Sequence, residues 1–166
     1  MIELTQIGVI HSPFQRATGT PIQPFCARGV EGWIEVFGPF AEGLRDLDGF
    51  ERVWLLFWCH RASEPKLTVI PYRDTVEHGL FATRAPSRPS PIGMSAVRLL
   101  GISDNHLRVG ELDILNGTPL LDIKPYVSQY DSYPDQRCGW LDEGRARLRT
   151  ISADDRFEIA PVHART

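Results

Sequence analysis

The sequence lacks the glycine signatures by which many proteins hold nucleotides. No Gly-x-Gly occurs in its 166 residues, which excludes the GxGxxG dinucleotide turn and the glycine loop of Rossmann-type methyltransferases, and GxxxxGK[ST] is missing as well. The motifs GxSxG and HExxH are also absent, which argues against a serine hydrolase and a zinc peptidase. A nucleotide-like ligand must therefore be held in another way.

Cysteines are few and long apolar runs are missing. Cys26, Cys59 and Cys138 are widely separated and lack CxxC or Cys/His spacing, so we expect no disulfide framework, no zinc and no other metal. No segment approaches the roughly 18 consecutive apolar residues of a membrane span, and the amino terminus has no basic start. We therefore expect a cytoplasmic protein that makes no membrane contact.

Positive charge is scarce overall but locally concentrated. The net charge of -3 argues against a nucleic-acid binder that relies on bulk charge. Between His78 and Ser103, however, there is no carboxylate, while Arg84, Arg88 and Arg98 supply positive charge. Three prolines stiffen residues 84–91, which predicts an extended loop suited to an anionic ligand. A solvated arginine cluster remains the alternative interpretation.

Proline and glycine divide the chain into short segments, most of which have strand character. The expected strands cover residues 7–10, 33–37, 52–60, 67–70, 80–83, 94–102, 107–115 and 120–126, with one short amphipathic helix at 40–47. This pattern predicts a mainly β fold, a small single-sheet β-barrel with one or two short helices. We expect residues 1–127 to form the barrel and 128–166 a short, loop-rich extension of the same domain, ending in a strand at 157–159.

Polar residues lie at the ends of several apolar segments, where side chains leave a core. They are His60 with Arg61, Arg84, Asp113, and Asp122 with Lys124. Three of these positions have a simpler alternative: His60 as a cap at a strand edge, Asp113 on a solvent face, and Asp122 with Lys124 as a surface ion pair. The sequence pattern alone does not separate these alternatives.

Four motifs resemble those of a known family. They are IGVIHSPF (7–14), PIQPF (21–25), FATRAPSRPSPIGMS (81–95) and LDILNGTPLLDIKPYV (112–127). In this order they resemble the TrmO family, also known as TsaA-like, YaeB-like or VirR-like proteins. Its members are S-adenosylmethionine-dependent enzymes that methylate N6 of threonylcarbamoyladenosine beside the tRNA anticodon.

The resemblance implies a barrel that binds S-adenosyl-L-methionine without a Rossmann loop, as a homodimer whose cofactor site lies near the subunit interface. The positions that match the family's cofactor pocket are Gln23, Pro24, His60, Arg61, Arg84, Met94, Asp113, Ile114 and Leu115.

We also expect residues that serve the methyl acceptor. Because an exocyclic amine is a poor nucleophile, a hydrogen-bond acceptor beside it should help, and Asp122 is the catalytic candidate, with Lys124 and Tyr126 to orient it or to contact the acceptor. Arg88 and Arg98 are expected to contact tRNA phosphates.

The chain departs from the family pattern at three positions. Ser87 stands where histidine is common, Ser90 where asparagine is usual and Asn116 where aspartate is usual, while YPDQRCGW (133–140) resembles a later family element, PxxRxGW. Two alternatives therefore remain beside tRNA methylation: methyl transfer to a small molecule, and a non-catalytic module that binds S-adenosylmethionine.

Overall fold

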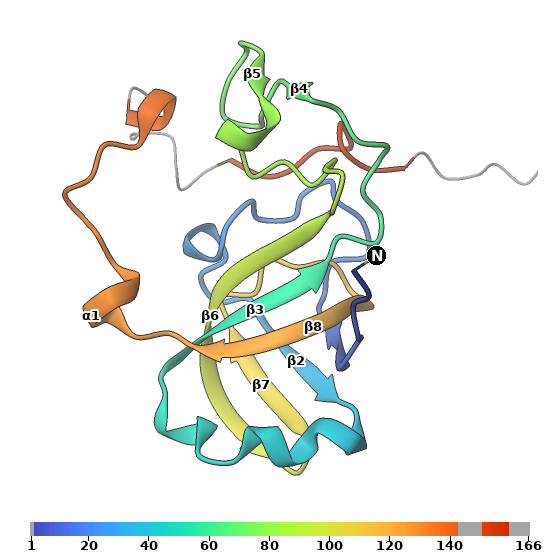
Figure 1. Ribbon diagram of the computed structural model, residues 1–166, viewed down its shortest axis with the longest axis vertical. Coiled ribbons are helices and arrows are strands. Elements are labelled where there is room, and N and C mark those ends of the chain that lie inside the picture. The colour runs from blue at the N-terminus through green and yellow to red at the C-terminus, as the bar shows by residue number, and fades with distance from the viewer. Residues whose placement is uncertain (1, 143–150, 160–166) are drawn as a thin grey trace, which may run out of the picture.

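A closed six-stranded antiparallel barrel forms the centre of the computed structural model, which describes residues 2–142 and 151–159 (Figure 1). The strands follow one another around the barrel as β1 (Gly8–His11), β2 (Glu31–Val36), β7 (His106–Gly110), β6 (Ile92–Ser103), β3 (Arg52–Trp58) and β8 (Thr118–Pro125), which closes on β1. The expectation of a mainly β, single-sheet, non-Rossmann barrel is confirmed.

The barrel interior is built from alternate residues of its strands. On β3, Val53 and Leu55 point inward and are fully buried, and Ile34 on β2 and Val97 on β6 do the same. Each such side chain contributes about 1.5–3 kcal/mol by leaving water. The intervening residues of β3, including Trp54 and Leu56, therefore lie on the outer face of the barrel.

Short helices and a small second sheet complete the fold. The expected helix at 40–47 is observed as the 3₁₀ helix η2 (Gly38–Leu44), which with η3 (Leu47–Gly49) closes one end of the barrel. At the other end lie η1 (Pro24–Cys26), η4 (Leu80–Ala82) and a two-stranded sheet of β4 (Thr68–Val69) and β5 (His78–Gly79) (Figure 1). The single α-helix of the described residues is α1 (Ser128–Asp131), and none of their helices is long and apolar enough to cross a membrane.

Three expected strands were wrong in whole or in part. In place of the strand at 80–83, Leu80–Ala82 form η4, and the hydroxyl of Thr83, which follows the helix, donates to the Leu80 carbonyl at 2.8 Å. The strand expected at 107–115 ends at Gly110, because Glu111 adopts a left-handed backbone with φ of 59°. In the tail, the expected strand at 157–159 is reduced to an isolated bridge between Glu158 and Ala62.

Residues 84–91 form a loop without helix or strand, as expected, but the loop bends: the Arg88 amide donates to the Pro86 carbonyl and the Ile92 amide to the Ser90 carbonyl, each at 2.8 Å. The tail segment 151–159 crosses the same end of the barrel, where Ala153 exchanges backbone hydrogen bonds with the 17–20 loop and Ser63 donates to the Phe157 carbonyl at 2.9 Å (Figure 1). This end of the molecule therefore gathers segments from both ends of the sequence.

Candidate functional site

A cavity of about 330 Å³ opens at the end of the barrel where β3 finishes and β6 begins. Eight of the nine residues expected to bind a cofactor line it: Gln23, His60, Arg61, Arg84, Met94, Asp113, Ile114 and Leu115. The ninth, Pro24, is the buried first residue of η1 and lies outside the lining, although it follows Gln23 directly. The structure thus brings the predicted residues to one place.

Arg84 joins two of the sequence motifs across the cavity. Its Nη1 donates to Oε1 of Gln23 at 2.7 Å, which ties the FATR segment to PIQPF. Both side chains line the cavity. A guanidinium held in this way suits a carboxylate, which it can bind through two parallel hydrogen bonds.

Asp113 places a carboxyl group in the cavity wall. The left-handed turn at Glu111 takes residues 111–117 out of the sheet. The Oδ1 atom of Asp113 is buried and has no hydrogen-bond partner among the described residues. Burial raises the pKa of Asp113 to about 7, and a hydrogen bond from Ser95 and the charge of Arg84 offset only part of that rise. An unpartnered buried oxygen is costly, so this group is suited to accept a hydrogen bond from a ligand.

His60 and Cys59 present uncharged groups to the same cavity. Burial lowers the pKa of His60, and the neighbouring Arg61 charge lowers it further, while Nδ1 lies 3.4 Å from the Thr118 hydroxyl. Burial raises the pKa of Cys59 to about 11, so its thiol stays protonated at neutral pH. Neither side chain is set up as a nucleophile or as a cation.

The tail forms a wall of the cavity that sequence reasoning missed. Ala153, Phe157 and Glu158 line it, and Glu158 lies 3.7 Å from Arg61 while accepting a hydrogen bond from the Ala17 amide at 3.3 Å. No motif in the polar tail signalled this role.

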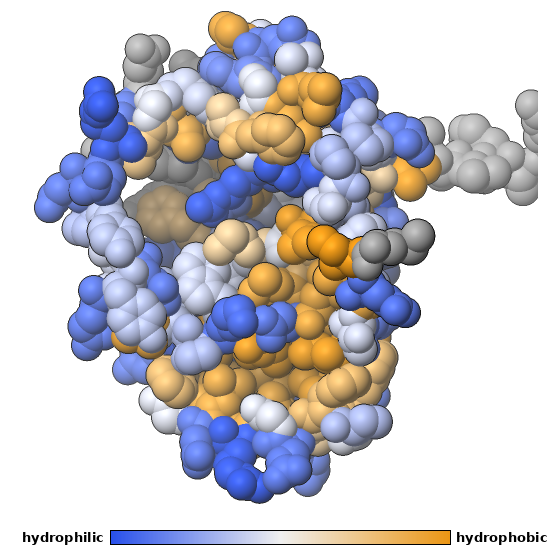
Figure 2. Space-filling view, in the orientation of Figure 1, coloured by the Kyte–Doolittle hydropathy of each residue, from blue (hydrophilic) through white to orange (hydrophobic). Residues whose placement is uncertain are grey.

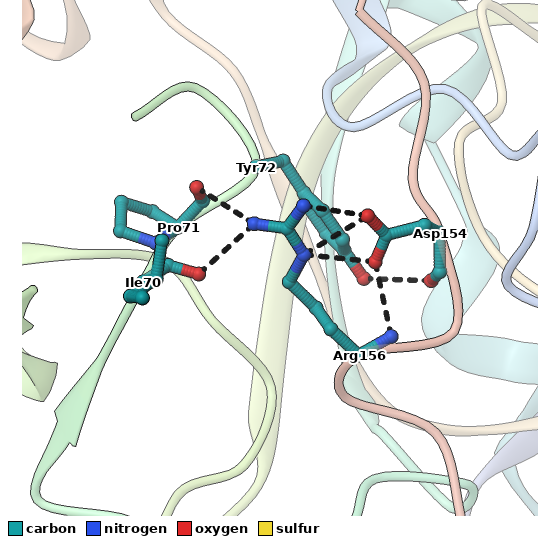
Figure 3. Close-up of polar contacts among 5 residues, drawn as sticks. All are labelled: Ile70, Pro71, Tyr72, Asp154 and Arg156. Atoms are coloured by element: carbon teal, nitrogen blue, oxygen red, sulfur yellow. Dashed lines mark hydrogen bonds and ion pairs between the residues drawn. The ribbon is translucent and has the colours of Figure 1, made fainter. Parts of the chain in front are cut away.

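Arg156 fastens the tail in this position (Figure 3). Its guanidinium pairs with Asp154 at 2.6 Å, donates to the carbonyls of Ile70 and Pro71, and lies 5.2 Å from the centroid of the Tyr72 ring. The Tyr72 hydroxyl in turn donates to the Asp154 carbonyl at 3.2 Å.

The wall formed by Phe57 and Gly93 was also missed. A Cβ on Gly93 would collide with the Phe57 ring, which lies directly against the glycine. Both residues line the cavity. The glycine of PIGMS therefore makes room for an aromatic wall, a role that only the pairing of β3 with β6 reveals.

The residues expected to serve the methyl acceptor do not gather in the cavity as the predicted cofactor residues do. Arg88 lines the cavity, but its Nη1 donates to the Thr83 and Ala85 carbonyls at 3.1 and 3.2 Å and so braces its own loop. Arg98 is exposed further along β6 and does not line the cavity.

The three catalytic candidates, Asp122, Lys124 and Tyr126, also lie outside the cavity lining. Asp122 and Lys124 are joined by an ion pair at 2.8 Å. In register, Asp122 and Met94 flank Leu56 on the outer face of the barrel, so Asp122 lies two strands away from a cavity residue.

The departures from the family pattern do not alter the cavity lining. Ser87 is fully buried, and its hydroxyl lies 2.8 Å from that of Ser63. Asn116 accepts a hydrogen bond from the Ser12 amide at 3.1 Å, and Ser90 lies in the proline-rich loop. None of the three lines the cavity.

The donor set of the cavity fits S-adenosylmethionine. It combines an arginine for a carboxylate, a carboxyl oxygen for an amine or hydroxyl, and the apolar side chains of Phe57, Ile114 and Leu115. Its volume lies at the lower end of the range of small-molecule sites. Residues 2–142 and 151–159 hold no cluster of three His, Cys, Asp or Glu side chains that suits a metal ion.

Comparisons with known proteins identify relatives of this chain. The chain is 48% identical over 157 residues to a probable S-adenosyl-L-methionine-binding protein of Pyrococcus abyssi, a match that covers 95% of this chain and 85% of that protein. It is 35% identical over 160 residues to the tRNA (adenine(37)-N6)-methyltransferase of Escherichia coli, covering 90% and 68% of the two chains.

A crystal structure of TrmO from Pseudomonas aeruginosa superposes with a TM-score of 0.72 at 39% identity, covering 84% of this chain and 62% of that one. This chain therefore spans about three fifths of that longer protein. The family model of the tRNA-methyltransferase O N-terminal domain matches residues 9–132, which include β2 to β8, all of β1 except Gly8, and most of the cavity lining. With its barrel, its motifs and its cavity in agreement, the chain belongs to the tRNA-methyltransferase O N-terminal domain family.

Proposed function

We propose that the protein is an S-adenosylmethionine-dependent methyltransferase that methylates N6 of threonylcarbamoyladenosine next to the tRNA anticodon. One observation carries the proposal: residues from PIQPF, FATR, PIGMS and LDIL, up to about ninety positions apart, meet in a single cavity. The family match and the name of the Escherichia coli relative support the acceptor.

Named residues would hold the cofactor. Arg84, oriented by Gln23, binds the carboxylate, and Asp113 accepts a hydrogen bond from an amine or hydroxyl of the ligand. Ile114, Leu115 and Phe57 enclose the apolar parts and exclude water. The bound cofactor supplies an electrophilic methyl group on a sulfonium, so the protein's remaining tasks are to position the acceptor amine and to manage its proton.

A homodimer would bring the catalytic candidates into play. The outer face of β3, β6 and β8 carries exposed apolar side chains, with Met94 46% and Ile92 39% exposed and Leu56 between Met94 and Asp122 (Figure 2). Met94 and Ile92 also line the cavity, so a partner docked on this face would lie at the cavity mouth. We infer that Asp122, with Lys124 and Tyr126, accepts the amine proton in that assembly.

The acceptor is proposed to be tRNA rather than a small molecule. The altered residues Ser87, Ser90 and Asn116, which had favoured a small acceptor, lie outside the cavity. Arg88 and Arg98 are proposed to contact tRNA phosphates. We also propose that the enzyme is cytoplasmic. We further propose that residues 128–166 extend the barrel domain of residues 1–127.

Methyl incorporation tests the proposal. Wild-type protein should transfer labelled methyl to tRNA that carries threonylcarbamoyladenosine and not to tRNA that lacks this modification. Arg84→Met should weaken cofactor binding at least about 10-fold in calorimetry, because a charge-assisted pair is lost. Arg45→Met, which removes only an exposed ion pair with Glu42, is the matched control. Cofactor binding without methyl incorporation would contradict the proposal.

The role of Asp122 has its own variant. Asp122→Asn should lower turnover by at least about 100-fold, within the range for general acid–base catalysis, and leave the cofactor Kd unchanged. Near-normal turnover would remove Asp122 from the reaction.

A further inference from the structure

A second cavity, of about 480 Å³, adjoins the cofactor cavity. The two share the side chains of Gln23, Thr83, Arg84, Tyr72 and Phe157, so the Arg84–Gln23 pair stands in the wall common to both. A ligand in the second cavity would therefore lie directly beside one in the first.

Aromatic side chains from distant segments line the second cavity. Phe81, on η4, is 77% exposed and lies 5.7 Å from the Arg88 guanidinium, measured to its ring centroid. Trp140 comes from the YPDQRCGW element, about sixty residues further along the chain, and lines the cavity together with Leu141. An aromatic residue exposed to this degree is available to stack on a planar ligand.

Two contacts fix the position of Trp140, and a third contact fixes the residue on which it stacks. Its Nε1 donates to the Ala82 carbonyl at 2.9 Å, and its ring stacks on His78 at 4.5 Å with an interplanar angle of 19°. His78 Nε2 is held 2.8 Å from Asp74 Oδ2. An indole oriented in this way forms a pre-organised wall, which reduces the entropy cost of binding.

The charge of the second cavity is positive. Arg73 and Arg84 line it, and among residues 2–142 and 151–159 no aspartate or glutamate does. Together with the aromatic walls, this combination fits a planar, aromatic ligand that carries an anionic group.

We propose that the second cavity binds the acceptor nucleobase, with its acidic N6 substituent directed to Arg73, and that Phe81 and Trp140 hold the base. The inference rests on the proposed function and assigns the acceptor to its own site. A base enters such a cavity only after leaving its stack, and aromatic walls compensate for the lost stacking. The YPDQRCGW element thereby acquires a function in substrate binding.

Steady-state methylation of modified tRNA tests the inference with the variants Phe81→Ala and Trp140→Leu. Each should lower kcat/KM about 10-fold or more, the loss expected for one base–aromatic stack, and leave the cofactor Kd within about 2-fold. Phe40→Ala, which truncates an aromatic residue on η2 at the opposite end of the barrel, is the matched control and should change neither value. Arg73→Gln should reduce the preference for the acidic modification over plain adenosine in tRNA.

The outcomes separate the inference from the function on which it rests. A wild-type protein that fails to methylate modified tRNA would overturn the proposed function. If the wild type is active and both aromatic variants match Phe40→Ala, the inference alone fails. Thermal denaturation first identifies any variant that is unfolded. In a folded variant, equal losses of cofactor affinity and kcat/KM would show that the second cavity belongs to the cofactor, and would also overturn the inference.

Discussion

Asp113 carries a carboxyl group that lines the cavity and whose pKa is set mainly by burial. Its Oδ1 is buried without a partner among the described residues, and its pKa is raised to about 7. Such a group binds a proton in the folded protein at pH values where the unfolded chain has already released it. Its contribution to the free energy of unfolding is therefore fully present below pH 4 and is lost as the pH rises toward 7.

This sign gives a prediction for Asp113→Asn. Between pH 4 and pH 8, the free energy of unfolding of the ligand-free wild type should fall relative to that of the variant. The difference is up to about 4 kcal/mol, at about 1.4 kcal/mol for each unit of pKa shift. Urea denaturation at several pH values measures it, with Asp104→Asn, at an exposed turn, as the control. If the free energies of unfolding of wild type and Asp113→Asn change with pH in parallel, the pKa of Asp113 is not raised by burial.

Among the elements, β6 shows how one strand serves several purposes. Its first residues, Ile92 to Ser95, line the cavity, Val97 packs in the barrel core, and Met94 also reaches the outer face. The strand could be predicted from its apolar residues, but the close approach of Phe57 to Gly93 arises only when β3 pairs with it.

Two glycines of β6 allow a matched comparison. Gly93→Ala should displace the Phe57 ring and raise the cofactor Kd at least about 10-fold, because the added methyl collides with a cavity wall. Gly101→Ala, on the same strand, meets no atom within 4 Å and should bind the cofactor normally. Calorimetry measures both affinities, and equal affinities would show that the Phe57 wall plays no part in binding.

At the scale of the whole molecule, the proposed dimer depends on one side of the barrel. Leu56 lies at the centre of the outer face of β3, whereas Trp33, 42% exposed, lies on β2, which is opposite β3 in the closed ring of strands. A lysine can therefore replace an apolar side chain at either position, on opposite sides of the barrel, as a matched pair of variants.

Leu56→Lys should convert a homodimer into monomers in sedimentation velocity, because an ammonium replaces an apolar contact at the interface. The loss of the dimer should also lower the rate of methylation, since the catalytic candidates lie on this face. Trp33→Lys should remain dimeric. A wild type that sediments as a monomer at micromolar concentration would refute the proposed assembly.

The sequence by itself determined the barrel class, the irregular loop at residues 84–91 and eight of the residues that line the cavity. These features are local: alternating apolar residues specify which strand face is buried, prolines exclude helix and strand from the loop, and contiguous motifs mark positions that line the cavity. Only the tertiary structure decided which distant segments meet. Glu158 reaches the amide of Ala17, 141 positions away, and Trp140 reaches the carbonyl of Ala82. Polar contacts between such separated residues leave no periodic signal in the sequence, because they depend on how the closed barrel brings its loops together.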